Sequence, residues 1–582
     1  MTLLDISDYA LDLPDGTRLL DGVSLSVAAG ETVGLVGESG SGKSLTARSV
    51  IGLQPRGATT GGTVRLDGRE VLGAPVGELL ALRRTSAGMV FQDPRAGINP
   101  MRTIGDHLTE TLRLVDGRSR ADADARAIEL LRAVRLPRAE DHLRQYPHEL
   151  SGGMLQRVMI AGALTSSPRL LICDEPTTAL DVTTQAEIIA VLGEQRATRG
   201  MGMLFITHDL NLAASICDRV YVMSAGRVVE EGDARRVFRN PQAAYTRRLV
   251  AATPTIAPVA PLVPFVVDEA TDAATASVRD DAPDAASAPR TVVDLPRAVD
   301  AGPGGAPMLD VRSISKTYNL HGKPPVRAVV DASIEIPRGG ALAVVGESGS
   351  GKSTLARMIV GLEAADTGEI LVDGTARTAM PRRRAERLAH SRSVQMVFQD
   401  PYLSLDPRIP AGRAIEEALR LHSTLTSRDA RTRVLDLLEQ VGLGERHATA
   451  RPRTLSGGQR QRVAIARALA IEPDVLVMDE ATSALDVSVQ AQVLDLVAGI
   501  RRERGLTVLF ISHDLAVVRR VCEQTVVMRS GEIVERGATA ALLERPQHPY
   551  TRLLLDSVPR PDWDLDALGA DATEERPEGI TA

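Results

Sequence analysis

The chain has 582 residues, of which 43% are hydrophobic and 25% charged, and its formal net charge is −7. This length exceeds what one hydrophobic core usually supports, so we expect at least two domains, and the composition excludes disorder throughout. The acidic balance and an aromatic content of 2% argue against a protein whose main task is to grip nucleic acid. The three scattered cysteines show no CxxC spacing, which indicates a reducing compartment and gives no metal framework.

The N-terminal residues give no sign of export. They carry acids where a secretory signal peptide would carry basic residues, and they lack an apolar core segment. We therefore expect the chain to stay in the cytoplasm.

Short apolar runs alternate with helical stretches along each half. In the first half, TVGLVG at 32–37 precedes KSLTARSVIGL at 43–53, and LLICDE follows at 170–175. This alternation predicts an α/β fold with a mainly parallel sheet. Residues 95–149 and 402–454 read as mostly helical and separate from the alternation, so we expect a helical subdomain in each half.

A glycine-rich motif at residues 37–44 lies between an apolar strand and a helix start. Its sequence, GESGSGKS, fits G-x-x-x-x-G-K-[ST] and returns unchanged at 346–353. In this context the glycines let backbone N–H groups close on phosphate oxygens. Lys43 would reach the β- and γ-phosphates, and Ser44 would hold Mg²⁺. One copy alone could be a glycine-rich turn, but two copies in register favour a phosphate cradle.

An apolar strand that ends in Asp-Glu follows in each half. The acids are Asp174 and Glu175 in the first half and Asp479 and Glu480 in the second. Two acids at a buried strand end are costly unless a cation or a reaction needs them. We expect each aspartate to approach Mg²⁺ and each glutamate to polarise the water that attacks the γ-phosphate. An acidic turn is the alternative, and the position after LSGG disfavours it.

A histidine beside an acid follows a third apolar run, as His208 in MLFITHD and His513 in VLFISHD. Alone, such a histidine would more often be structural. Its equal distance from Asp-Glu in both halves favours a γ-phosphate sensor. Gln92 and Gln399, both in FQDP, are candidates to bind Mg²⁺ or the water, although FQDP alone would only indicate a turn.

The sequence LSGG opens a helix at 150–153 and again at 455–458. By itself it is a serine-capped helix start that exposes backbone N–H groups. However, the P-loop, FQDP, LSGG, Asp-Glu, ALDV and the histidine occur in this order in both halves. The chain therefore contains one domain twice.

The two copies are separated by a segment rich in Ala, Pro, Asp and Val with little periodicity. Such a segment cannot offset its ordering entropy by burial, and a flexible chain of about 50 residues spans roughly 40 Å. This reach allows the two domains to face each other. The expected organisation is a first ATPase domain at 1–252, a flexible linker at 253–307, a second ATPase domain at 308–560 and a disordered acidic tail at 561–582.

Together, these motifs resemble those of the ATPase subunits of ABC transporters, over nearly the whole chain apart from the linker and the tail. The resemblance implies two P-loop NTPase cassettes, each with a RecA-like parallel-sheet core, an antiparallel β subdomain and a helical subdomain. It also implies that the cassettes close head to tail, so that each ATP lies between the P-loop of one half and the signature LSGG of the other. Asp181 and Asp486, in ALDV, would lie at this seam.

The resemblance assigns ATP, Mg²⁺ and catalytic roles residue by residue. The ATP-binding residues of the first site would be Gly37, Ser39, Gly40, Gly42, Lys43, Ser44 and Gln92, with Ser456 and Gly458 from the second half. Those of the second site would be Gly346, Ser348, Gly349, Gly351, Lys352, Ser353 and Gln399, with Ser151 and Gly153 from the first half. The Mg²⁺ ligands would be Ser44, Gln92 and Asp174, and Ser353, Gln399 and Asp479. The catalytic residues would be Glu175, His208, Glu480 and His513, so both sites should hydrolyse ATP.

Longer sequence motifs narrow the resemblance to one group of ABC importers. YPHELSGGMLQRVMIA and DEATSALDVSVQ, with the endings NPQAAYTRRLV and RPQHPYTRLLLDSVP, look like importers of dipeptides, oligopeptides and nickel. Those importers use two ATPase subunits, which this chain would combine. The resemblance implies two integral membrane permeases, an extracytoplasmic solute-binding protein and a peripheral location on the cytoplasmic face of the inner membrane. The Gln92 and Gln399 loops would receive the coupling helices of the permeases.

Three departures from the family pattern change what we expect. No cysteines follow Tyr245 or Tyr550 where some relatives carry them, so no iron–sulfur cluster is expected. The second signature follows ARPRT, whereas the first follows YPHE. Tyr318 would stack on adenine in the second half, whereas Leu13 fills that place in the first, so ATP should bind the first site more weakly.

A different class of protein also carries two cassettes on one chain, namely soluble ATPases that act on ribosomes or DNA. Those on ribosomes usually have a long, charged helical linker, whereas this linker is acidic and broken by prolines. DNA-repair relatives carry zinc-binding cysteines, which are absent from this sequence. We therefore expect a peptide importer without nucleic-acid contacts, with nickel, metallophore or glutathione as alternative solutes.

Overall fold

The computed structural model describes residues 1–178, 180–254, 306–319, 324–377, 381, 383–399, 404–482, 485–560 and 563. The predicted linker and acidic tail lie almost entirely outside these ranges, so their boundaries stay predictions. Within the described ranges, no helix combines the length and the apolar character needed to cross a membrane.

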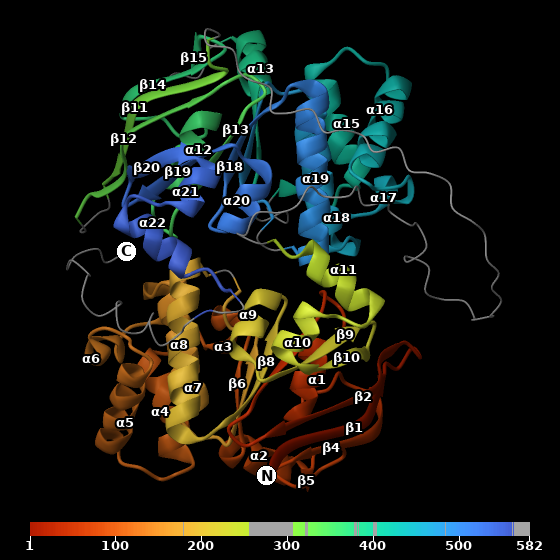
Figure 1. Cartoon of the computed structure of the whole chain (residues 1–582), viewed down its shortest axis with the longest axis vertical. Helices are drawn as coiled ribbons and strands as arrows, with labels where there is room; N and C mark the ends of the chain where they lie inside the picture. Colours follow the sequence, from red (N-terminus) through yellow and green to blue (C-terminus); the bar gives the residue numbers. More distant parts are fainter. Residues whose placement is uncertain are drawn as a thin grey trace, which may run out of the picture.

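Each half contains a mainly parallel six-stranded sheet, as predicted (Figure 1). Only the edge strands β10 and β20 run antiparallel to their neighbours. In spatial order the first sheet is β10 (Arg227–Asp233), β9 (Arg219–Ser224), β3 (Thr32–Val36), β8 (Gly202–Thr207), β7 (Leu170–Asp174) and β6 (Ala87–Val90). The second is β16 (Val394–Val397), β17 (Val475–Asp479), β18 (Thr507–Ile511), β13 (Ala341–Val345), β19 (Gln524–Arg529) and β20 (Glu532–Ala538).

The central strands read as unbroken apolar runs because both faces of the sheet are covered. On β8, Leu204 and Ile206 pack in a core shared with α1 (Lys43–Val50) and the antiparallel sheet, whereas Met203 and Phe205 pack against helices. All six residues of β8 are buried. The strand ends that carry the motifs are thus held by a rigid two-sided core.

A four-stranded antiparallel sheet flanks each parallel sheet and confirms the predicted β subdomains. In the first half it consists of β2 (Arg18–Ala28), β1 (Thr2–Asp12), β4 (Thr59–Leu66) and β5 (Arg69–Glu70). In the second half it consists of β12 (Val326–Ile336), β11 (Leu309–Tyr318), β14 (Thr367–Val372) and β15 (Thr375–Ala376).

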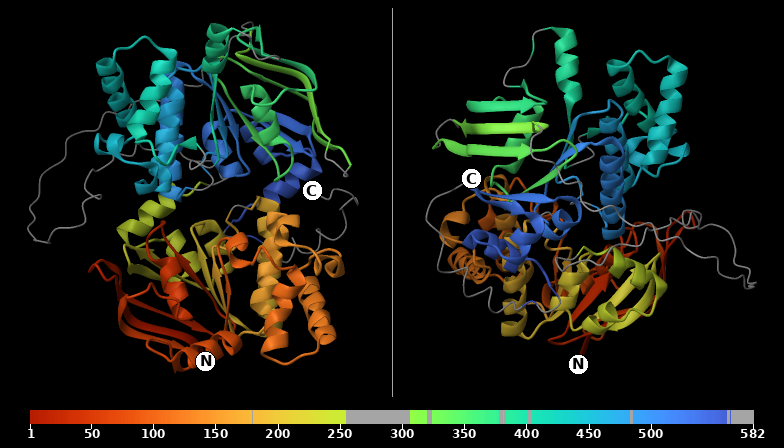
Figure 2. Two further views of the ribbon diagram at one scale, coloured as in Figure 1. Left: turned by 180° about the vertical axis from the view of Figure 1, so that it is seen from behind. Right: turned by 45° about the horizontal axis from the view of Figure 1, so that its top comes forward.

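The helical subdomains also form where they are predicted. The helical subdomain of the first half consists of α4 (Ile104–Leu114), α5 (Arg120–Ala133) and α6 (Ala139–His142), which pack beside α7 (Gly152–Leu164). The helical subdomain of the second half consists of α15 (Ala411–His422), α16 (Ser427–Gln440) and α17 (Arg446–Thr449), which pack beside α18 (Gly457–Leu469). Figures 1 and 2 show that the helical region of each half lies on the side of the antiparallel sheet of the other.

Helices near the end of each half contact the opposite half. The helix α11 (Ala244–Ala252) packs against α19 (Val487–Arg504), and α22 (Pro549–Asp556) packs against α8 (Val182–Arg199). Trp563, beyond α22, packs against the main core of the first half. The C-terminal segments of both halves therefore take part in the contact between them.

Candidate functional site

The first P-loop joins the end of β3 to the start of α1. Gly37 has a φ of 150°, and a Cβ atom there would lie 2.2 Å from the carbonyl oxygen of Met223, so the close packing of the loop requires glycine. Lys43 Nζ donates to the carbonyl oxygens of Gly37 and Glu38 over 2.7 and 2.8 Å. Burial holds the pKa of Lys43 below its ordinary value, although nearby carboxylates, Glu175 first, oppose this effect.

The second P-loop repeats this geometry between β13 and α12 (Lys352–Val360). Lys352 Nζ donates to the carbonyl oxygens of Gly346 and Glu347, both over 2.7 Å. Gly346 has a φ of 152°, and a Cβ atom there would lie 2.2 Å from the carbonyl oxygen of Met528. In both loops the remaining predicted glycines also take the left-handed conformation, namely Gly40, Gly42, Gly349 and Gly351. Both loops therefore leave their backbone N–H groups around a concave turn.

A serine and a buried aspartate meet at the end of each loop. Ser44 Oγ donates to Asp174 Oδ1 over 2.6 Å, and Ser353 Oγ donates to Asp479 Oδ1 over 3.1 Å. Asp174 Oδ2 is buried and accepts no hydrogen bond from the described residues. Burial raises the pKa of both aspartates. A hydroxyl and an under-satisfied carboxylate fit a hard divalent cation such as Mg²⁺.

Glu175 lies where the predicted glutamine and histidine converge. Its Oε2 atom accepts a hydrogen bond from Gln92 Nε2 over 2.9 Å and lies 3.4 Å from His208 Nδ1. Thr178 Oγ1, which the sequence analysis did not identify, donates to the same oxygen over 3.0 Å. The backbone of Glu175 has a φ of 49°, a strained conformation for a residue other than glycine and one typical of functional sites.

The pair of Glu175 and His208 favours the charged form of both groups. Burial alone would raise the pKa of Glu175, but the hydrogen bond and the charge of His208 outweigh it, and the pKa is lowered. Burial would lower the pKa of His208, but Glu175 outweighs it, and the pKa is raised. Glu175 is therefore ionised at neutral pH and can accept a proton.

Glu480 meets the equivalent glutamine and histidine in the second half. Gln399 Nε2 donates to Glu480 Oε2 over 2.7 Å, and His513 Nδ1 lies 3.4 Å from Oε1. The φ of Glu480 is 47°. The hydrogen bond and charge of His513 outweigh burial and lower the pKa of Glu480. The structure thus brings glutamine, glutamate and histidine together twice.

The signature serines begin helices, as the sequence predicts. Ser151 Oγ accepts the N–H of Met154 at the start of α7, and Ser456 Oγ accepts the N–H of Gln459 at the start of α18. Gly153 packs so closely that an added Cβ atom would lie 2.7 Å from Thr184 Cγ2 on α8. The signature therefore adjoins the first turn of the helix that follows ALDV.

The acids of ALDV lie at contacts between the two halves. Asp486 Oδ1 accepts the backbone N–H of Ser39 over 2.6 Å, and Asp181 interacts electrostatically with the backbone of Ser348. Each acid therefore reaches the P-loop of the opposite half. In the first half, the signature glycine Gly153 packs against α8, the helix that Asp181 precedes.

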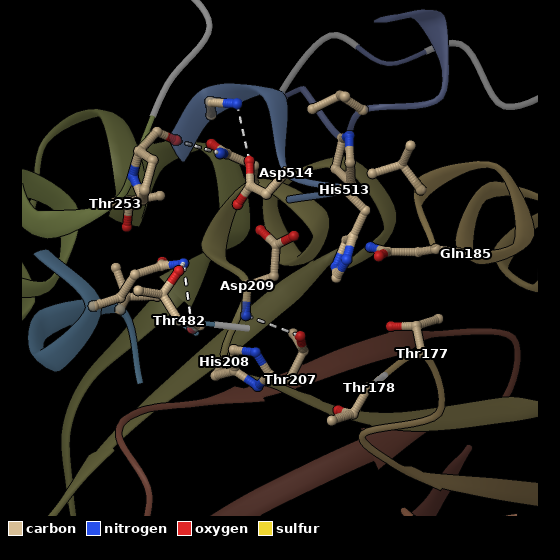
Figure 3. Close-up of a pocket in the computed structure, with 18 of the residues that line it drawn as sticks. Thr177, Thr178, Gln185, Thr207, His208, Asp209, Thr253, Thr482, His513 and Asp514 are labelled. Carbon is tan, nitrogen blue, oxygen red and sulfur yellow. Dashed lines mark hydrogen bonds between the residues drawn. The ribbon is translucent and has the colours of Figure 1, made fainter. Parts of the chain in front are cut away.

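A cavity of about 150 Å³ lies between the two halves and is lined by residues of both. His208 and Asp209 border it from one half, and His513 and Asp514 border it from the other (Figure 3). Burial raises the pKa of Asp209, and the charge of Asp514 raises it further. The motifs predict the two histidines, but no pattern in the sequence predicts that Asp209 and Asp514 lie at the same cavity.

The two predicted adenine positions differ. Tyr318 is half-buried at the end of β11, its hydroxyl donates to Glu363 Oε2, and its ring lies 5.8 Å from Lys316 Nζ. It also interacts with Thr354, the residue after Ser353, which places it next to the P-loop helix. Leu13 follows the end of β1 in the first half and offers no ring.

Comparisons with known proteins identify the family to which the chain is similar. A family model described as "ABC transporter" matches residues 20–178 and 329–483, and one described as "Oligopeptide/dipeptide transporter, C-terminal region" matches 229–275 and 534–579. The chain is 42% identical over 558 residues to the glutathione import ATP-binding protein GsiA of Escherichia coli, covering 92% of this chain and 86% of that protein. It is 40% identical over 607 residues to the oligopeptide transport ATP-binding protein OppD of Mycobacterium tuberculosis, covering 96% and 99%.

Among solved structures, a dimeric ATP-binding cassette in a post-hydrolysis state, bound to ADP and Pi, is 31% identical to the chain. The match covers 40% of this chain and 99% of that one, with a TM-score of 0.37. The two cassette matches take in more than half of the chain and confirm the resemblance expected from the motifs. The chain therefore belongs to the ABC transporter family, as an ATPase in which two ATP-binding cassettes share one polypeptide.

Proposed function

We propose that this ATPase powers the uptake of short peptides across the cytoplasmic membrane. The observation that carries the proposal is the match of both halves to the C-terminal region of oligopeptide/dipeptide transporters. The named solutes of two relatives support it, because one imports oligopeptides and the other imports glutathione, which is itself a tripeptide.

At each site the P-loop would bind the phosphates of ATP. Lys43 would exchange its carbonyl partners for the β- and γ-phosphates. The N–H groups of Gly40 and Gly42 would donate to phosphate oxygens, and the N–H of Ser39 would exchange Asp486 for a phosphate oxygen. The second site would use Lys352 with Ser348, Gly349 and Gly351. Tyr318 would stack on the adenine of the second site.

Glu175 is placed to act as the general base. As water attacks the γ-phosphorus, Glu175 would take the water proton, the new O–P bond would form and the bond to the bridging oxygen would break, leaving ADP and phosphate. His208 would contact the γ-phosphate, and Gln92 would orient the water. Glu480, His513 and Gln399 would act in the same way in the second half.

Mg²⁺ fits the hydroxyl and carboxylate found beside each P-loop. Ser44, Gln92 and Asp174 would hold it in the first half. Ser353, Gln399 and Asp479 would hold it in the second. When bound, the ion neutralises charge on the β- and γ-phosphates.

Each ATP would lie between the two halves. The first site would combine Lys43 with Ser456 and Gly458, and the second would combine Lys352 with Ser151 and Gly153. The contacts of Asp486 with Ser39 and of Asp181 with Ser348 support this pairing.

The chain would work as a peripheral subunit on the cytoplasmic face of the inner membrane. Its partners would be two integral membrane permeases, served by an extracytoplasmic solute-binding protein. The loops that carry Gln92 and Gln399, with the helical subdomains, would receive the permeases and couple ATP binding to their change of access.

Isolation of the tagged chain from gently solubilised membranes of its native cell tests this proposal. Mass spectrometry should identify two multi-span permeases among the co-purified proteins, whereas ribosomal or DNA-repair proteins would overturn the transport role. Uptake of labelled di- and tripeptides should then be lost without the chain and restored by the wild type but not by Glu175→Gln with Glu480→Gln. Glutathione is then added as a competitor. Strong inhibition of labelled peptide uptake would indicate that the importer also takes glutathione, and no inhibition would indicate other short peptides.

A further inference from the structure

The second residue of each P-loop reaches across to the opposite half. Glu347 Oε1 accepts a hydrogen bond from Thr183 Oγ1 over 2.6 Å, and Glu38 Oε1 accepts one from Ser488 Oγ. The single Thr183 hydroxyl proton is shared with Asp181 Oδ1, which lies 2.8 Å from Thr183 Oγ1. The carbonyl oxygens of the same two glutamates accept hydrogen bonds from the P-loop lysines Lys43 and Lys352. Neither carboxylate has a role in the chemistry proposed above.

The partner hydroxyls occupy equivalent places on two helices. Thr183 is the second residue of α8, and Ser488 is the second residue of α19. Both lie two residues after the ALDV acid that contacts the opposite P-loop. A carboxylate at the first turn of a helix is favoured by the helix dipole and by the exposed N–H groups there. Each interface therefore has a second polar link beside the one made by the ALDV acid.

The hydroxyl residue is followed by the residue that supports the signature. Thr184 packs against Gly153, and Val489 packs against Gly458, where an added Cβ atom would lie 2.4 Å from Cγ1. A direct line of contacts thus runs from the P-loop glutamate of one half to the signature glycine of the other. In the proposed pairing, that glutamate and that signature serve the same ATP.

The P-loop glutamate is also held from the C-terminal region of its own half. The N–H of Glu347 donates to Tyr550 Oη over 3.0 Å, and the N–H of Glu38 donates to Tyr245 Oη over 3.0 Å. The segment before Tyr550 is fixed in turn by Glu535, which accepts the N–H groups of Gln547 and His548. Burial raises the pKa of Tyr245 to about 12, so this hydroxyl stays neutral under ordinary conditions.

We propose that Glu38 and Glu347 are positioning residues that align each signature with the opposite P-loop through Ser488 and Thr183, and that Tyr245 and Tyr550 hold these glutamates in place. The inference rests on the proposed composite ATP sites. It adds that contacts of the P-loop glutamates determine how the two halves of each site align. It gives the C-terminal region of each half a direct contact with a P-loop. Loss of the link should slow the catalytic step while leaving nucleotide contacts intact.

A double-mutant cycle on the full-length chain tests this inference, with changes in both halves so that both sites are affected. One variant lacks the hydroxyls (Thr183→Val with Ser488→Ala), a second lacks the carboxylates (Glu38→Ala with Glu347→Ala), and a third lacks both. Each of the first two should lower kcat about tenfold, within the range expected for loss of one hydrogen bond. The kcat of the third variant should be no lower than that of the first two, because both sets of changes break the same hydrogen bonds. The KM for ATP should change less than about twofold, since none of these side chains would touch the nucleotide.

Two conservative variants separate positioning from folding. The exchange of the hydroxyl residues, Thr183→Ser with Ser488→Thr, should keep kcat within about twofold of the wild type, because both hydroxyls remain. Glu38→Asp with Glu347→Asp keeps the charge but shortens the reach, so kcat should fall while the melting temperature is unchanged. Multiplicative losses in the cycle, or unchanged kcat in the shortened variant, would overturn the inference. A wild-type chain that fails to hydrolyse ATP would instead overturn the proposed function.

Discussion

The two ATP sites can be compared atom by atom at the end where the γ-phosphate would react. The glutamine–glutamate hydrogen bonds measure 2.9 and 2.7 Å, and each histidine nitrogen lies 3.4 Å from its glutamate. At the other end the sites diverge, because Tyr318 has no aromatic counterpart at Leu13. The comparison indicates that the geometry of glutamine, glutamate and histidine is duplicated, whereas the aromatic ring at the predicted adenine position is not.

The flanks of the two signatures show how much sequence the fold tolerates. The first is preceded by YPHE, with the rings of Tyr146 and His148 stacked 5.7 Å apart, and the second by ARPRT. Both form the same short 3-10 turn, Pro147–Glu149 in one half and Pro452–Thr454 in the other. The difference in sequence therefore leaves the approach to the signature helix unchanged.

The largest effect should follow from removal of both general bases. Glu175→Gln with Glu480→Gln should lower ATP hydrolysis about 100- to 10,000-fold, because the amide cannot take the water proton. ATP should still bind, since the P-loops are intact. Phosphate release and retained radiolabelled ATP measure the two effects. The single variants Glu175→Gln and Glu480→Gln are the controls, and each should lower ATP hydrolysis by a similar factor. A much larger loss from one of them would show that the two sites do not hydrolyse ATP equally.

Changes at the predicted adenine positions should have a smaller effect on ATP binding, and the effect should differ between the two sites. Tyr318→Leu should weaken ATP binding at the second site about tenfold, within the range expected for loss of a base–aromatic stack. Leu13→Tyr should strengthen binding at the first site and make the two sites more alike. Tyr318→Phe is the matched control, because it keeps the ring and removes only the hydroxyl bonded to Glu363. Equilibrium ATP binding, measured in the hydrolysis-deficient background, should resolve two affinities in the parent chain and one in the Leu13→Tyr variant.

The smallest effect should be a pH-dependent loss of stability in the histidine variants. The raised pKa of His208 means that its pairing with Glu175 stabilises the fold fully below the ordinary pKa of histidine, and that this stabilisation is lost as pH rises through the raised value. The lowered pKa of Glu175 adds a loss at the acidic end, as pH falls through its folded value.

His208→Gln should therefore lower the melting temperature by about 2 °C near pH 6 and by less near pH 9. His513→Gln should show the same trend, because its pKa is raised by Glu480 in the same way. Thermal melts across this pH range measure both. A destabilisation that grows with pH would contradict the assigned charge states.

The sequence predicts much of the fold and the reacting end of each site because these depend on local patterns. The P-loop, the Asp-Glu strand end and the histidine each follow an apolar strand, and parallel strands bring their carboxyl ends to one edge. Repetition of the whole set in the same order removed the ambiguity of each motif alone.

The links between the halves could not be predicted in the same way. Glu347 and Thr183 lie in different domains, so no local pattern pairs a carboxylate with that hydroxyl. The available signal was weak, since Glu38 and Glu347, Thr183 and Ser488, and Tyr245 and Tyr550 recur at equivalent places in both halves. Such recurrence indicates a shared role but does not say which residues touch. The approach of Asp209 to Asp514 was missed for the same reason.

The most direct test of the account is whether each ATP site draws on both halves. In the Glu175→Gln, Glu480→Gln background, Lys43→Ala with Ser456→Ala removes two residues of one proposed site, whereas Lys43→Ala with Ser151→Ala removes one residue from each. The amount of ATP retained per chain after rapid filtration is then measured for both variants. The first variant should retain about one ATP and the second almost none, because only the first leaves a complete site. The reverse result would show that each P-loop works with the signature of its own half and would contradict the account.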